Sequence, residues 1–277
     1  MGKSKIEWLA RPGTIPTSWN PVTGCSPISP GCKNCYAERM SKRLAGRAGY
    51  PAAPHNFDVT LHPDKLEEPL RWRKPRTVFV CSMSDLFHEA LSVGDIEPIF
   101  RVIQATPQHT YFILTKRPER MDVAWGSLLF HHNGGYPHNP LPNVLLSVTI
   151  ENQEMADKRI PVLLQIPAAV RFISVEPMLG PVNIPPSLWT HKEWESVGQD
   201  PDIAGARLVL SKGIDWVICG AETGPGKRPM KLEWARDLRD QCRDAGIPFF
   251  FKRDGDGNGT LCGQEYHEWP EVNNARS

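Results

Sequence analysis

Long hydrophobic runs are missing from this sequence. No stretch of eighteen apolar residues occurs, so no segment is long enough to cross a membrane as a helix. The first thirteen residues, MGKSKIEWLARPG, lack the apolar core of a secretory signal peptide. We therefore expect a cytoplasmic protein without a membrane partner.

An excess of charge of one sign is lacking as well. The 32 Lys and Arg residues are balanced by 31 Asp and Glu residues, which gives a formal net charge of +1. Bulk charge therefore does not indicate nucleic-acid binding, although a local basic patch would be compatible with it. The chain also has no internal repeat.

Cysteine is present in an odd number, and nothing suggests secretion. The seven cysteines of the 277 residues are therefore expected to be reduced thiols. With 40% hydrophobic residues, a chain of this length can bury a substantial core without disulfide bonds. Clustered cysteines in such a protein suggest metal binding or redox chemistry.

Short β-rich runs alternate with helical patterns along the chain. The predicted strands cover residues 77–81, 111–115, 144–148, 170–175, 216–219 and 248–251, with a seventh, short strand near 20–23. The predicted helices cover residues 35–45, a segment around Ile96 to Ile103, 119–129, a segment from about 152 that Pro161 interrupts, and 232–245.

This alternation predicts an α/β fold with parallel strands and right-handed crossovers. We expect a full or partial (β/α) barrel of the TIM type, with an open doubly wound sheet as the alternative. The whole chain, residues 1–277, is predicted to be a single domain. It would carry a polar surface insertion near 187–211 and a loop-rich tail from residue 254.

Polar residues follow the predicted strands, where a barrel of this kind carries its chemistry. They are Ser82, Ser84, Asp85, Thr115, Lys116, Arg117, Thr149, Glu151, Asn152, Ser174, Glu176, Glu222 and Lys252. For each of them, an ordinary solvated loop position is the competing interpretation. Glu176 follows an apolar strand directly, so it should be half-buried and need a partner, for which Lys116 and Lys252 are candidates.

Three cysteines lie within eleven residues, with the spacing C-x6-C-x2-C. Cys25, Cys32 and Cys35 occupy a Pro- and Gly-rich loop that runs into a predicted helix. Thiolates are the usual ligands of iron–sulfur clusters, and three of them around four irons leave one iron open. The helix N-terminus at Cys35 would stabilise the negative charge.

Two other interpretations of this loop stay open. Zinc would need a fourth ligand, such as His55, His62 or Cys81, and no paired C-x2-C or H-x3-H motif occurs elsewhere. The thiols could also be inert or redox-active, as buried cysteines often are. Cys219 and Cys242, which lie in apolar patterns, are expected to be of this kind.

The surrounding phrases resemble the radical S-adenosylmethionine superfamily. They include "WNPVTGC", "SPGCKNCYAERM", "EPLRWRKPRTVFVCSMSDLFHE", "FILTKRPERM", "VTIENQ", "VRFISVEPMLGPV", "GAETGPGKRPM" and "LRDQCRDAGIPFFFK". Together they are similar to a family of phages and bacteria with a variant three-cysteine motif, from about Ile6 to Lys252. The superfamily usually has C-x3-C-x2-C with an aromatic residue before the third cysteine. Here that residue is Asn34, and Tyr36 is its expected substitute.

The resemblance implies two cofactors, a [4Fe-4S] cluster held by the three cysteines and S-adenosyl-L-methionine on the open iron. Cofactor-binding roles then fall on Tyr36, beside the third cysteine, and on the strand-end residues Ser82, Ser84, Asp85, Thr115, Arg117, Glu151, Glu176 and Glu222. Ser82, Ser84 and Asp85 would meet the cofactor's amino group. Arg117, or else Lys227 or Arg228, would pair with its carboxylate.

The resemblance also implies a reaction. Reductive cleavage of S-adenosylmethionine would give a 5′-deoxyadenosyl radical, which abstracts hydrogen from a substrate. Lys116, Glu176 and Lys252 are the predicted catalytic residues. Flavodoxin or ferredoxin would donate the electron, and the occurrence in phages suggests a nucleotide or nucleic acid substrate.

Two other classes of function are weighed against this one. The first is a zinc-binding protein that interacts with nucleic acid without catalysis, and the second is a barrel hydrolase or lyase using Glu176 and Lys116. The basic and aromatic segment LRWRKPR (residues 70–76) could contact phosphates, but solvated charge beside a core tryptophan is the simpler interpretation.

Overall fold

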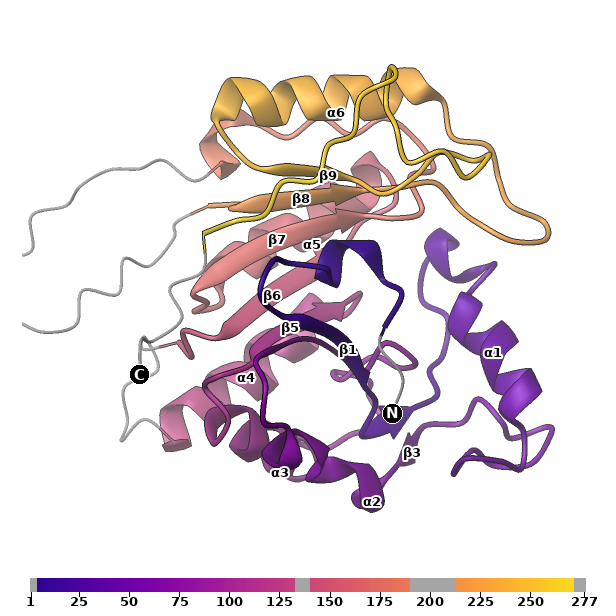
Figure 1. Ribbon diagram of the computed structural model, residues 1–277, viewed down its shortest axis with the longest axis vertical. Helices are drawn as coiled ribbons and strands as arrows, with labels where there is room; N and C mark the ends of the chain where they lie inside the picture. Colours follow the sequence, from indigo (N-terminus) through magenta and orange to yellow (C-terminus); the bar gives the residue numbers. More distant parts are fainter. Residues whose placement is uncertain (1–3, 133–139, 190–212, 272–277) are drawn as a thin grey trace, which may run out of the picture.

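The protein folds around one curled sheet of seven parallel strands. The computed structural model describes residues 4–132, 140–189 and 213–271. In spatial order the strands are β1 (Ile15–Trp19), β4 (Arg76–Val80), β5 (Thr110–Thr115), β6 (Val144–Thr149), β7 (Val170–Val175), β8 (Trp216–Cys219) and β9 (Phe249–Phe251). Every neighbouring pair is parallel. The sheet forms a half-barrel (Figure 1), which confirms the predicted α/β class.

Helices cover the convex face of this sheet (Figure 1). They are α3 (Val93–Gln104), α4 (Pro118–His132), α5 (Gln153–Gln165) and α6 (Leu232–Ala245). Outside this layer lie α1 (Tyr36–Leu44), α2 (Pro63–Leu66), the antiparallel pair β2 (Val22–Thr23) and β3 (Thr60–Leu61), and the short 3-10 turns η1 (Glu7–Leu9), η2 (Pro30–Cys32), η3 (Glu68–Arg71) and η4 (Pro186–Leu188). Among the described residues, no helix is long and apolar enough to span a bilayer.

The short strand predicted near residues 20–23 exists, but it does not belong to the main sheet. Residues 22 and 23 belong to the separate β2–β3 pair, and the first strand of the sheet is β1, whose sequence IPTSW shows no clear alternation. Pro16 within it argues against a central strand. The position is tolerated because β1 lies at the edge of the sheet and has only β4 as a neighbour.

One helix prediction also needs correction. α5 does not stop at Pro161 but runs through it to Gln165. Its buried side chains, Ile160 and Leu163 among them, pack in the core, and this burial offsets the lost backbone hydrogen bond. In α1 the buried side chains are Ala37 and Ser41.

The concave face of the half-barrel is filled by aromatic side chains near the N-terminal ends of the strands. Trp8 of η1 lies inside the curve, with its ring centroid 5.4 Å from that of Phe112 and 6.3 Å from that of Trp216. Phe172 packs 5.1 Å from Trp216. Since alternate residues share a face, the same face then continues as Ser147, Thr149 and Ser174 toward the C-terminal ends. The interior thus changes from aromatic to polar along the strands.

The gap between the edge strands β1 and β9 is covered by both ends of the chain. The Trp269 indole donates to the Trp8 carbonyl at 2.8 Å, and the Phe251 amide donates to the Tyr266 carbonyl at 2.8 Å. The tail from residue 254 is therefore packed on the sheet in part. The predicted insertion falls mostly on residues 190–212, outside the described ranges, and its flanks meet where Trp189 pairs with Ile214.

Candidate functional site

The cysteine-containing loop lies at the C-terminal edge of the half-barrel. We call residues 25–35 the cysteine loop. Just before it, Gly24 bridges to Ser84, beyond the end of β4, and the Ser84 hydroxyl donates to the Gly24 carbonyl at 2.5 Å. Gly24 has a φ of +85°, and a Cβ there would lie 2.1 Å from the Asp58 carbonyl oxygen. Only glycine therefore lets the chain enter the loop at this place.

The three thiols of the loop differ from three others in the chain. Cys25, Cys32 and Cys35 are partly exposed, whereas Cys81, Cys219 and Cys242 are buried and Cys262 is exposed on the tail. Cys35 is the residue that precedes α1, as predicted. Within the described ranges, no three His, Cys, Asp or Glu side chains are grouped closely enough to hold a single metal ion.

Arg117 fastens the start of the loop to the sheet. Its guanidinium is 4% exposed and donates to the Cys25 sulfur at 3.6 Å and to the Ser26 carbonyl at 3.0 Å. The same group pairs with Asp85 at 3.2 Å and with Glu89 at 2.8 Å. Arg117, predicted to bind a cofactor carboxylate, thus already has two carboxylate partners and holds the loop.

Asp85 is engaged in the same network. One of its oxygens accepts from the Thr115 hydroxyl at 2.7 Å, and the other from the Lys116 amide at 3.1 Å and from Arg117. The Thr115 hydroxyl also accepts from the Arg117 amide at 2.9 Å. Both predicted cofactor-binding residues therefore hold the end of β5 and the Arg117 side chain.

Glu151 supports the middle of the loop from below. Its carboxylate is fully buried and accepts from the Gly31 amide at 3.0 Å and from Arg159 at 3.0 Å. A Cβ on Gly31 would lie 3.2 Å from this carboxylate, so the loop approaches it as closely as a side-chain-free residue allows. Arg159 comes from α5 and also donates to the Thr149 carbonyl at 2.6 Å.

Glu222 fastens the end of the loop. It accepts from the Asn34 side chain at 2.9 Å and from the Arg228 guanidinium at 2.5 Å. Arg228 in turn donates to the Pro30 carbonyl at 2.9 Å. Hydrogen bonds from Arg228, joined by that from Asn34 and opposed by burial, lower the pKa of Glu222 to about 2. The pair is therefore ionised at neutral pH and ties two points of the loop to the segment after β8.

Tyr36, Ser82 and Ser84 connect the loop to the end of β4. The Tyr36 hydroxyl donates to the Ser82 carbonyl, and the Ser82 hydroxyl donates to the Asn20 side chain at 3.2 Å. The Ser84 hydroxyl is used by Gly24. The two serine hydroxyls predicted to meet a cofactor thus have protein partners, while the Tyr36 ring remains 49% exposed.

The three predicted catalytic residues, unlike most of the predicted cofactor-binding residues, are partly exposed to solvent. Lys252 pairs with Glu176 at 2.5 Å, and the two side chains are 21% and 23% exposed. Lys116 is partly exposed, and its ammonium forms no hydrogen bond or ion pair within the described residues. Its charge acts on Cys32, as described next.

The cations around the loop affect its thiols differently. Burial raises the pKa of Cys25 to about 11, with Asp85 adding to the rise and Arg117 opposing it. Burial also opposes ionisation of Cys32. There the Lys116 ammonium and hydrogen bonds from the backbone of Ile28 and Ser29 bring the pKa below its usual value. Cys32 is thus the more readily ionised of the two thiols.

Several residues of the site escaped sequence reasoning. Asn34, Glu89 and Arg159 hold the loop or its supports, and His88 contacts Ser26 at 2.7 Å. The Ala90 amide donates to Nδ1 of His88, so Nε2 carries the proton and donates to the Ser26 hydroxyl. His88 and Glu89 follow the predicted Asp85 directly, which is the one signal that could have found them.

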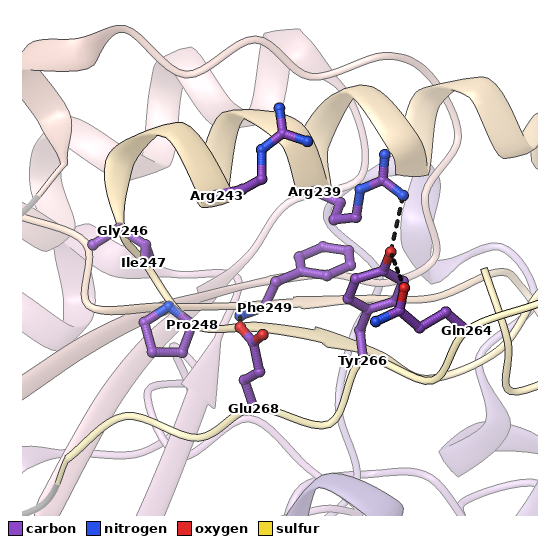
Figure 2. A pocket seen from close by; sticks show the side chains of 9 residues that line it. All are labelled: Arg239, Arg243, Gly246, Ile247, Pro248, Phe249, Gln264, Tyr266 and Glu268. Atoms are coloured by element: carbon purple, nitrogen blue, oxygen red, sulfur yellow. Dashed lines mark hydrogen bonds between the residues drawn. The ribbon is translucent and has the colours of Figure 1, made fainter. Parts of the chain in front are cut away.

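A cavity of about 660 Å³ lies elsewhere, between α6 and the tail. Figure 2 shows Arg239 and Arg243 on the helix above Phe249, Gln264, Tyr266 and Glu268. Both arginines are paired with aspartates of their own helix, and Glu268 accepts from the Phe249 amide at 2.8 Å. This cavity contains none of the predicted site residues.

The Glu222–Arg228 pair gives a testable pH dependence. Because the folded-state pKa of Glu222 lies below its usual value of 4.5, the ionised pair stabilises the fold above that value, and the stabilisation is lost as the pH falls toward 2. We expect Glu222→Gln to lower the free energy of unfolding at pH 7 by about 1–2 kcal/mol, since Arg228 is partly solvated. In urea unfolding, this difference should shrink between pH 5 and pH 2, and a constant difference would contradict the assignment.

Comparison with known proteins places the chain in a family. A family model described as "Protein of unknown function (DUF5131)" matches residues 3–266. No curated protein and no solved structure matches the chain significantly. Because the matched range includes the cysteine loop and all seven strands of the sheet, the chain belongs to the DUF5131 family.

Proposed function

We propose that this protein is a radical S-adenosylmethionine enzyme with a partial TIM-type barrel. In this proposal Cys25, Cys32 and Cys35 hold a [4Fe-4S] cluster with one open iron. The observation that carries the proposal is the cysteine loop itself. Three partly exposed thiols lie on one loop at the C-terminal edge of a parallel half-barrel, and buried charged residues fasten that loop at its start, middle and end.

The residues present suit such a cluster chemically. Thiolates are its usual ligands, and the Arg117 guanidinium and the Lys116 ammonium lie where they offset negative charge at Cys25 and Cys32.

When bound, the cluster and S-adenosylmethionine would supply a 5′-deoxyadenosyl radical able to abstract hydrogen from a substrate. The chain itself would orient and shield the reactants. Arg117, Glu151 and Glu222 are assigned to positioning the cysteine loop, because their charges are already paired. Asp85 and Thr115 belong to the same support.

Fewer side chains are free to contact a ligand than the sequence suggested, because the positioning residues are already paired. The Tyr36 ring, the unpaired Lys116 ammonium and the Glu176–Lys252 pair are assigned to contacts with cofactor or substrate. Glu176 and Lys252 can exchange their mutual contact for one with a hydroxyl or an amino group of a ligand. Flavodoxin or ferredoxin as electron donor, and a nucleotide or nucleic acid as substrate, complete the proposal.

Anaerobic reconstitution tests this function. Purified protein is supplied with iron and sulfide, reduced, and mixed with S-adenosylmethionine, and the products are separated by chromatography. We expect a brown protein with about four irons per chain that forms 5′-deoxyadenosine. One zinc per chain in colourless protein would favour the non-catalytic alternative. A metal-free protein of undiminished stability would favour a hydrolase or lyase instead.

A further inference from the structure

One side of α1 carries an exposed stripe that begins within the cysteine loop. Tyr36, Met40 and Arg43 are exposed, and their spacing of three and four residues puts them along one side of the helix. Lys33, just before the helix, and Arg47, beyond its end, are exposed as well. We call these five residues the α1 stripe. Tyr36 and Met40 are 49% and 40% exposed. The helix lies at the edge of the molecule (Figure 1).

The stripe is basic although the protein as a whole is nearly neutral. Residues 33–47 contain five cations, Lys33, Arg39, Lys42, Arg43 and Arg47, against the single carboxylate of Glu38. The Glu38 carboxylate forms an ion pair with the Lys42 ammonium at 3.1 Å. Arg39 donates only to the Thr223 carbonyl. Within the described residues, Lys33, Arg39, Arg43 and Arg47 therefore have no carboxylate partner.

We propose that the α1 stripe binds single-stranded nucleic acid, which would be the substrate class of the neighbouring site. Exposed cations without carboxylate partners can neutralise the phosphates of a strand. An exposed aromatic ring between such cations is the usual platform on which a base stacks. An acidic protein partner would match the cations, but it would not stack on the exposed Tyr36 ring as a base can.

The position of Tyr36 connects the stripe to the site. Its ring belongs to the stripe, while its hydroxyl donates to the Ser82 carbonyl at the end of β4. It follows Cys35 directly. A strand lying on the stripe would thus bring a base to the C-terminal edge of the half-barrel, and a base must be unstacked to enter an enzyme pocket. Only this catalytic consequence rests on the proposed function, since strand binding itself needs no cofactor.

The basic segment at residues 70–76 offers a matched control. Arg73 and Lys74 are exposed, but they precede β4 and so lie at the opposite end of the strands from the cysteine loop. The nearby Trp72 ring is covered by Arg76, 4.7 Å from its centroid, and by His109, at 5.4 Å. This segment therefore has the charges of the α1 stripe without an available ring.

The test is binding of a fluorescent single-stranded DNA of about 20 nucleotides, followed by anisotropy across a salt series. For the full chain we expect log K to fall against log salt with a slope of about −2 to −3, because three or four phosphates are neutralised. Arg43→Glu with Arg47→Glu should weaken binding at least about tenfold and bring the slope closer to zero by about 1.4. Arg73→Glu with Lys74→Glu should change affinity less than about twofold.

Several outcomes would overturn the inference. One is an equal loss of DNA affinity in the two double variants. Another is unchanged affinity in Arg43→Glu with Arg47→Glu. The third is displacement of the DNA by polyglutamate as readily as by unlabelled DNA of equal charge. Far-UV circular dichroism and melting of both variants check that they fold. DNA binding is measured without iron, so the two proposals can fail separately. If the protein loads no cluster but binds DNA through Arg43 and Arg47, only the proposed function is contradicted. If it forms 5′-deoxyadenosine but does not bind DNA, only this inference is contradicted.

Discussion

Replacing Cys25, Cys32 or Cys35 by alanine is expected to abolish loading of a four-iron cluster. Each thiolate would be the only protein ligand of one iron, so a loop with two thiols leaves two irons without protein ligands. We expect iron per chain after anaerobic reconstitution to fall from about four to below one. The absorbance near 400 nm should be lost with it.

The matched controls are cysteines outside the loop. Cys262 is exposed on the tail, so its replacement by alanine removes a thiol without opening a cavity, and iron loading should stay at the level of the unaltered protein. Cys242 is buried in the main core and tests whether any lost thiol matters. If Cys262→Ala reduced iron as much as Cys32→Ala, or if all three loop variants still bound four irons, the assignment would be wrong.

Much of the fold could be predicted because apolar strands buried on both faces leave a plain signal. Residues 170–175 and 216–219 are strands with the predicted bounds, and each is buried throughout. β1 escaped because an edge strand with a proline carries neither a continuous apolar run nor an alternating one. The helix was wrongly expected to be interrupted at Pro161, because burial of one face of α5 outweighs the free-energy cost of a proline within the helix.

The site was predictable in place and less so in its contacts. A parallel sheet brings the residues after its strands to one edge, so Glu151, Glu176 and Glu222 could be grouped from the pattern alone. Their hydrogen-bond partners could not be predicted, because Gly31 lies 120 residues from Glu151 and Asn34 lies 188 residues from Glu222 in the sequence. A short polar loop such as the cysteine loop carries no periodicity that would show which buried carboxylate supports it.

The second large effect is expected at the buried pair beneath the loop. Arg159→Met should lower the free energy of unfolding by about 3–5 kcal/mol, measured by urea denaturation. The Glu151 carboxylate is fully buried and Arg159 is 5% exposed, so the variant leaves a carboxylate without its counter-ion and outside the reach of water. Methionine roughly preserves the packing of the arginine stem, so the loss reports the missing charge rather than a cavity.

A second substitution separates the charge from the rest of the site. In Arg159→Met with Glu151→Gln, the amide oxygen can still accept from the Gly31 amide, but no charge is left to be balanced. We expect the double variant to lose only about 1–2 kcal/mol, less than the single one, because the Thr149 carbonyl and the new amide then lack partners but no buried ion does. If both variants unfold at the same urea concentration, the unpaired charge is not the cause of the stability lost in Arg159→Met.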